Sequence, residues 1–161
     1  MKKSLSILIG LVLALCLFCA AAATLAETVP TLNDMPFPVI EDDNTTIDEA
    51  AFQGAWKADK AFVGETFVTL DALKADYNIT LPDIRLQDGS VFFDVADENG
   101  GTVEHGQAYT FEAGQIGFDD ESGNNAVIDL LEDGNIMMSI FLKEEGDQVL
   151  CVTVFLVRAD A

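Results

Sequence analysis

The sequence has little positive charge. Of its 161 residues only 8 are Lys or Arg, against 28 Asp or Glu, so the formal net charge is −20. Nucleic-acid-binding proteins neutralise phosphates with basic side chains, and this excess of acid excludes that class of partner. The same charge disfavours binding to anionic membranes and favours a soluble protein with neutral or cationic partners.

Histidine and cysteine are also scarce, which disfavours the enzyme classes that use them as nucleophile or general base. The single histidine, His105, lies in a polar stretch, so a hydrolytic nucleophile has no good general base. Cys151 lies in an apolar run, where we interpret it as a small buried side chain rather than a nucleophile. The oxygen-rich stretches 97–101 and 119–125 lack EF-hand spacing, and weak calcium binding is the alternative to solvated loops. We therefore expect no catalytic activity, no cofactor and no metal site.

The first 26 residues have the three parts of a secretory signal peptide. A positive start, Met1–Lys3, precedes an apolar run over 5–18, and small residues at 24 and 26 mark a cleavage site. A transmembrane anchor is the alternative, since the apolar stretch is long enough to span a bilayer, but no basic cluster follows it. Cleavage removes two lysines and no acid, leaving 6 basic against 28 acidic groups, a net charge of about −22. We predict a secreted or extracytoplasmic protein without stable membrane association after cleavage.

Residues 27–50 are predicted to be an acidic, proline-containing linker. They hold three prolines and the acidic run 41–43, and they show no sustained period of a strand or a helix. Four apolar residues interrupt this pattern and can pack on the domain that follows: Met35, Phe37, Val39 and Ile40.

Residues 51–161 are predicted to form one β domain. Apolar residues alternate with polar ones, and short turns such as Asp88-Gly89, Ala113-Gly114 and Asp133-Gly134 separate the runs. Residues 97–106 are interpreted as a polar connection. Eight strands are expected, over 54–63, 84–87, 90–96, 107–112, 115–119, 125–132, 135–143 and 147–158.

Two segments early in this domain have specific patterns. In the first strand, Trp56, Ala58 and Phe62 share one face, and Lys60 is the exception on that face. After it, one short helix is expected over 69–77. Thr69 can cap this helix, and Leu70, Leu73 and Tyr77 fall on one side of it.

The last two strands are apolar on both faces, which indicates that both faces are covered. A meander of eight strands can close on itself and so remove its unpaired edges. The predicted fold is therefore an all-β, eight-stranded antiparallel up-and-down barrel with one short helix after the first strand, and we expect a monomer. A two-sheet β-sandwich is the alternative.

Gly54-Ala55-Trp56 at the start of the first strand, followed by a meander of short strands, resembles the lipocalin-like (calycin) proteins, and most of all the short lipocalin-like domains of secreted bacterial proteins. In that group a Gly-x-Trp in the first strand plugs one end of the barrel, and a late Arg often packs over the Trp. Arg158 is the candidate here. The early helix departs from the family, whose helix usually comes late. The resemblance implies a small apolar ligand inside the barrel.

Five aromatic side chains are candidates to line such a ligand cavity. Small eight-stranded barrels are either filled by their own side chains or leave space for one small ligand, and both outcomes stay open here. A filled barrel would favour an interaction module that contacts a protein or a glycan through its loops. The candidate lining residues are Trp56, Phe93, Tyr109, Phe111 and Phe118.

Overall fold

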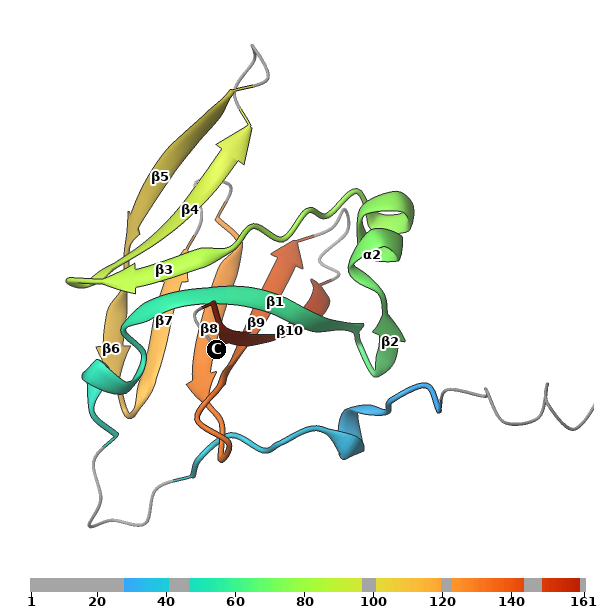
Figure 1. Ribbon diagram of the computed structural model, residues 1–161, viewed down its shortest axis with the longest axis horizontal. Coiled ribbons are helices and arrows are strands. Elements are labelled where there is room, and N and C mark those ends of the chain that lie inside the picture. The colour runs from blue at the N-terminus through green and yellow to red at the C-terminus, as the bar shows by residue number, and fades with distance from the viewer. Residues whose placement is uncertain (1–27, 41–46, 97–100, 120–122, 144–148, 160–161) are drawn as a thin grey trace, which may run out of the picture.

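One antiparallel sheet rolls into a nearly closed barrel, and the described residues form one α-helix near its start (Figure 1). This confirms the predicted all-β barrel and leaves no role for a two-sheet sandwich. The predicted signal peptide lies outside the residues described. The computed structural model describes residues 28–40, 47–96, 101–119, 123–143 and 149–159.

The described residues form ten strands, which follow the chain order around the barrel, and the pairing of β1 with β10 joins the first strands to the last. The sheet order is β5-β4-β3-β1-β10-β9-β8-β7-β6, and β2 pairs with the C-terminal end of β1. The first long strand therefore lies beside the last, as an up-and-down barrel requires. The strands are β1 (Gly54–Val63), β2 (Thr66–Val68), β3 (Ile84–Gln87), β4 (Ser90–Ala96), β5 (Thr102–Ala108), β6 (Thr110–Glu112), β7 (Gln115–Asp119), β8 (Asn125–Leu130), β9 (Ile136–Lys143) and β10 (Val149–Arg158).

The two ends of this order, β5 and β6, are consecutive in the chain and meet at Tyr109. β5 pairs with β4, whereas β6 pairs with β7, so one extended run changes partner at Tyr109. The prediction that residues 97–106 form only a connection is wrong from Thr102 onward, where β5 begins. Most of its side chains are polar and exposed, so a hydrophobicity pattern does not reveal it, and its pairing with β4 defines it as a strand.

Two of the three predicted tight turns have the backbone that their residues favour. Asp88 and Gly89 have φ of 50° and 74°, and Ala113 and Gly114 have 50° and 77°. Two positive φ angles in succession join neighbouring strands with the correct twist. The third turn is longer than predicted, since β8 ends at Leu130 and β9 begins at Ile136.

A β-bulge in β1 corrects the predicted face of this strand. Ala58 lies opposite Leu156 and Lys60 opposite Phe155, so Asp59 is an extra residue in the ladder. One added residue turns all later side chains to the opposite face. Ala61 therefore joins Trp56 in the main core, and the prediction that Phe62 shares the face of Trp56 is wrong.

Phe62 instead belongs to a second apolar cluster on the outside of β1, β9 and β10. The N-terminal segment covers this cluster with Leu32 and Met35 (Figure 1). The segment is tied down because Pro38 and Leu131 form a bridge. The main core and this cluster account for the strands that are apolar on both faces.

The helix α2 (Leu70–Tyr77) forms where its cap predicts it. The Thr69 hydroxyl accepts a hydrogen bond from the Ala72 N–H at 3.2 Å. Of the three residues expected on one side, only Leu73 is buried in the core, while Leu70 and Tyr77 are more than one-third exposed. Two 3-10 turns, η1 (Leu32–Asp34) and η2 (Glu49–Ala51), complete the elements. Among the residues that the structure describes, no helix has the length and apolarity needed to cross a bilayer.

Candidate functional site

One end of the barrel is closed by Trp56 and Arg158. Trp56 is fully buried, and its indole N–H donates to the Phe52 carbonyl at 2.8 Å. The Arg158 guanidinium lies 4.1 Å from the centre of the Trp56 ring. It also donates to the carbonyls of Gln53 and Ala51 at 2.6 and 2.9 Å. Arg158 therefore fastens the chain before β1 over the end of the barrel.

Gly54 is part of the same unit. Its φ of +127° is one that side chains rarely adopt, and a Cβ there would lie 2.6 Å from an Arg158 nitrogen. The Gly54-Ala55-Trp56 sequence and Arg158 therefore depend on one another, since the absent side chain makes room for the arginine.

Tyr109 and Phe111 also face the closed end. The Tyr109 hydroxyl donates to Glu49 Oε1 at 2.6 Å and accepts from Gln53 Nε2 at 2.9 Å. Burial of the phenol raises the pKa of Tyr109, and its hydrogen bond to the Glu49 carboxylate raises it further. The Phe111 ring packs edge-on against Phe52 at 6.0 Å. These contacts hold η2 against the barrel.

The opposite end contains an apolar pocket of about 250 Å3. The segment 79–82, which follows α2, forms one wall, and strands β3, β4, β7, β8 and β9 form the others. Its buried floor consists of Ile84, Val91, Ala126 and Met138. Its partly exposed walls include Ile79, Leu81, Pro82, Phe93, Phe118 and Leu142.

Polar groups are few in this pocket. Among the described residues only Thr80, Asn124 and Asn125 contribute polar side chains, and none of the lining residues is charged. The volume lies between the roughly 150 Å3 of an apolar cavity that binds benzene and the roughly 300–1,000 Å3 of drug-sized sites. The pocket is therefore suited to one small apolar molecule.

The β4–β5 hairpin extends the pocket wall outward. On its inner face, the His105 ring stacks on Phe93, with centroids 6.2 Å apart. Val95 and Val103 pair beyond them and are 41% and 48% exposed. The inner side of the hairpin is thus an apolar surface that continues from the pocket.

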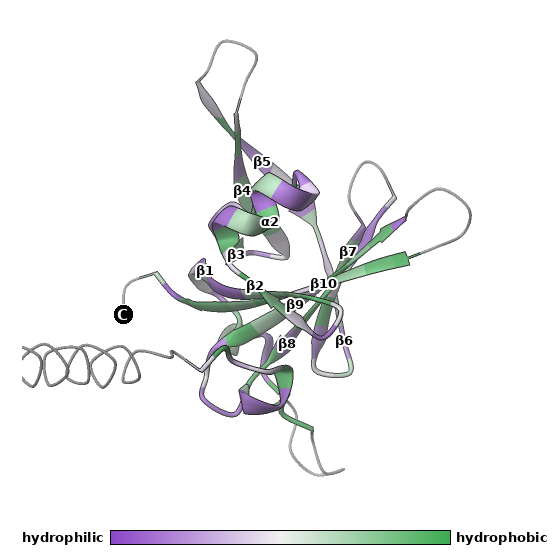
Figure 2. Ribbon diagram, turned by 90° about the vertical axis from the view of Figure 1, so that its right-hand side faces the viewer, coloured by the Kyte–Doolittle hydropathy of each residue, from purple (hydrophilic) through white to green (hydrophobic). Residues whose placement is uncertain are grey.

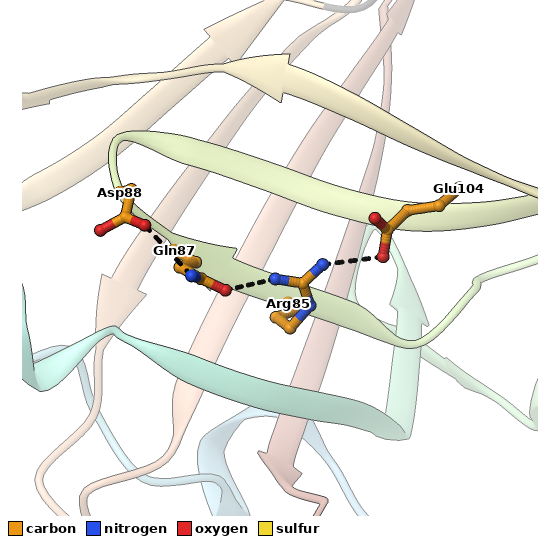
Figure 3. Close-up of polar contacts among 4 residues, drawn as sticks. All are labelled: Arg85, Gln87, Asp88 and Glu104. Atoms are coloured by element: carbon orange, nitrogen blue, oxygen red, sulfur yellow. Dashed lines mark hydrogen bonds and ion pairs between the residues drawn. The ribbon is translucent and has the colours of Figure 1, made fainter.

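The outer face of the hairpin is held by a cross-strand stack. The Arg85 guanidinium lies 4.4 Å from the centre of the Phe92 ring, and that ring lies against Gly106, where a Cβ would approach it to 2.8 Å. Arg85 also reaches Glu104 at 2.8 Å and hydrogen-bonds to Gln87, which donates to Asp88 (Figure 3). These contacts join β3 to β5 across β4.

A second, more polar groove lies at the seam between β5 and β7, which do not pair with each other. β7 pairs with β6 only as far as Gly117, so Phe118 and Asp119 have no strand partner on that side within the described residues. Figure 2 shows the β4–β5 hairpin and the end of β7 pointing apart. The groove has a volume of about 350 Å3. Its lining includes Gln107, Tyr109, Thr110, Phe118, Asp119 and Asn125.

The structure thus divides the five predicted lining residues between two ends. Phe93 and Phe118 line the apolar pocket, Trp56 and Phe111 pack in the closed end, and Tyr109 lies between the closed end and the seam groove. Sequence reasoning missed the segment 79–82. Its signal is an apolar Ile79 and Leu81 in a stretch that is neither helix nor strand.

The described cysteine and histidine lie apart from one another. Cys151 is a free, half-buried thiol on β10, and His105 lies on β5, with three strands between them in the sheet order. Within the described ranges, no group of three His, Cys, Asp or Glu side chains is placed to hold a metal ion. No model of a known protein family matches the chain, and no curated protein is significantly similar to it.

Proposed function

We propose that this chain is a secreted, non-catalytic, lipocalin-like protein that binds one small apolar molecule at the open end of its barrel. The observation that carries the proposal is the apolar pocket of about 250 Å3, which lies opposite a closed end. A barrel that is solid at one end and hollow at the other has the architecture of a ligand carrier.

Two further features support the lipocalin-like relationship and the location. The Gly54-Ala55-Trp56 motif opens β1, and Arg158 covers the Trp56 ring as the late arginine does in that family. The leader sequence at 1–26 supports export, and the high negative charge supports a soluble monomer that remains free of anionic surfaces.

Titration of the labelled protein with uncharged apolar ligands tests the proposal directly. Toluene, indole and naphthalene form a series of increasing size, and neutral probes avoid repulsion by the acidic protein. Amide NMR signals of residues such as Ala126 and Met138 should shift saturably. The signals of Trp56 and Arg158, at the closed end, should remain in place.

Variants that fill the pocket sharpen the test. Ala126→Leu adds volume to the floor, and Leu81→Trp adds volume to the wall without changing a buried position, so a folding defect in the first leaves the second informative. We expect either variant to weaken binding at least about tenfold, since displaced ligand loses most of its burial. Ala75→Leu, on the exposed side of α2, is the matched control. The proposal is wrong if no ligand gives saturable shifts, or if both filling variants bind as the native protein does.

A further inference from the structure

The apolar pocket and the seam groove are neighbours. Phe118 and Asn125 line both cavities, so only these shared side chains separate a molecule in the pocket from the groove. The barrel wall is open at this point because β6 pairs with β7 only as far as Gly117, and no described strand pairs with the remainder of β7 on that side. A ligand longer than the pocket can therefore extend sideways through the seam.

The two cavities differ in chemistry. The pocket offers almost only apolar side chains, whereas the groove offers the amide of Gln107, the hydroxyl of Thr110 and the carboxylate of Asp119. A ligand that occupies both must have an apolar body and a polar head group.

The charge of the groove selects the head group. Asp119 is the one charged side chain among the described residues that line either cavity. It accepts a hydrogen bond from Asn125 at 3.2 Å, which leaves most of its lone pairs for a ligand. Lys143 lies outside both linings, with its ammonium against Gly123. In the parts of the chain that the structure describes, neither lining contains a lysine or arginine that could neutralise a carboxylate ligand, and the acidic protein as a whole repels anions.

We propose, on the basis of the proposed function, that the ligand is a small cationic amphiphile. Its apolar body occupies the pocket, and its ammonium head passes through the seam to Asp119. The head forms a charge-assisted hydrogen bond with the carboxylate, while Asn125 and Gln107 supply neutral partners. Fatty acids and other apolar anions are disfavoured as ligands.

Three ligands with one n-hexyl body and different heads test this inference. Hexylammonium, hexanol and hexanoate are titrated separately at neutral pH and low salt, with amide NMR shifts as the readout. We expect hexylammonium to bind best and hexanoate worst, with hexanol between them. The preference for the ammonium head over hexanol should be roughly threefold to fivefold, because an exposed ion pair contributes little. It should shrink at high salt. Only the ammonium ligand should also shift the amides of Ala108 and Gly117 in the groove.

Asp119→Asn keeps the shape of the site and removes its charge. We expect it to abolish the preference for hexylammonium and leave hexanol affinity unchanged. Glu112→Gln removes one negative charge from an exposed position at the other end of β6 and should change neither. Because both variants have the same net charge, a difference between them reports a local effect.

The possible failures are distinguishable. If hexanol binds in the pocket but the three heads bind equally, the inference is overturned and the proposed function stands. If hexanoate binds best and Lys143→Met removes that preference, the head group lies at Lys143 and the inference is again overturned. If none of the three ligands binds, the proposed function fails and the inference fails with it.

Discussion

The two ends of the barrel contain similar side chains but use them differently. At the closed end, Trp56 and Tyr109 each have polar partners, and Arg158 joins the ring of Trp56 to the backbone before β1. At the open end, Phe93 and Phe118 both line a pocket that the neighbouring side chains do not fill. In the part of the chain that the structure describes, no buried side-chain nitrogen or oxygen lacks a hydrogen-bond partner.

This difference teaches that aromatic content alone does not locate a cavity. The closed end is solid because a short segment before β1 folds back as η2 and fills it with Phe52. The open end stays hollow because the segment after α2 forms a wall of the pocket and leaves the space beside it empty. We therefore expect stability to depend on one end and ligand affinity on the other.

The largest contrast is expected from one substitution made at both ends. Leu156 is 1% exposed in the core near Trp56, whereas Leu142 lines the open pocket. We expect Leu156→Ala to lower the free energy of unfolding by about 2–5 kcal/mol and Leu142→Ala by less than about 1.5 kcal/mol, because a side chain at the pocket already lacks neighbours. Urea unfolding followed by circular dichroism measures both. Equal losses would contradict the proposed asymmetry.

The two cation–π arginines provide the next contrast. The hydrogen bonds from Arg158 to two backbone carbonyls are partly buried, whereas the ion pair of Arg85 with Glu104 is exposed at the surface. We expect Arg158→Met to cost about 2–3 kcal/mol of unfolding free energy, since two carbonyls lose their donor. Arg85→Met should cost less than about 1 kcal/mol. A smaller effect at Arg158 than at Arg85 would show that the closed end is not fastened in this way.

A smaller, pH-dependent effect is expected at Tyr109. Its raised pKa means that folding favours the protonated phenol, so this contribution is complete below the ordinary tyrosine pKa and is lost as the pH rises through the raised value. We expect Tyr109→Phe to cost about 1–2 kcal/mol at neutral pH and the difference from the native protein to shrink above about pH 10.

Tyr77→Phe is the control for this prediction, because Tyr77 is 43% exposed on α2. It should change the unfolding free energy by less than about 0.5 kcal/mol. Melting temperatures recorded from about pH 7 to about pH 11 distinguish the variants. A pH-independent cost of Tyr109→Phe would mean that the phenol hydrogen bonds do not favour the neutral form.

Local chemistry predicted the elements that depend on a few neighbouring residues. The Thr69 cap placed α2, and Asp88-Gly89 and Ala113-Gly114 placed their turns. The alternation of Trp56 with polar residues predicted that it points inward. These features can be predicted from the sequence because each depends on only a few neighbouring residues.

Features that depend on distant parts of the chain were not predicted. The bulge at Asp59 follows from the pairing of β1 with β10, and no pattern within β1 alone specifies it. β5 is a strand because it pairs with β4, although most of its own residues are polar. The pocket depends on how the segment 79–82 crosses the barrel, which is a tertiary property.

Xenon binding to a crystal of the protein tests the central claim most directly. Xenon occupies apolar cavities that are not filled by side chains and needs no polar contact. We predict one xenon site at the open end, above Met138 and between Phe93 and Phe118, and none beside Trp56. An empty open end, or xenon bound against Trp56, would contradict the account.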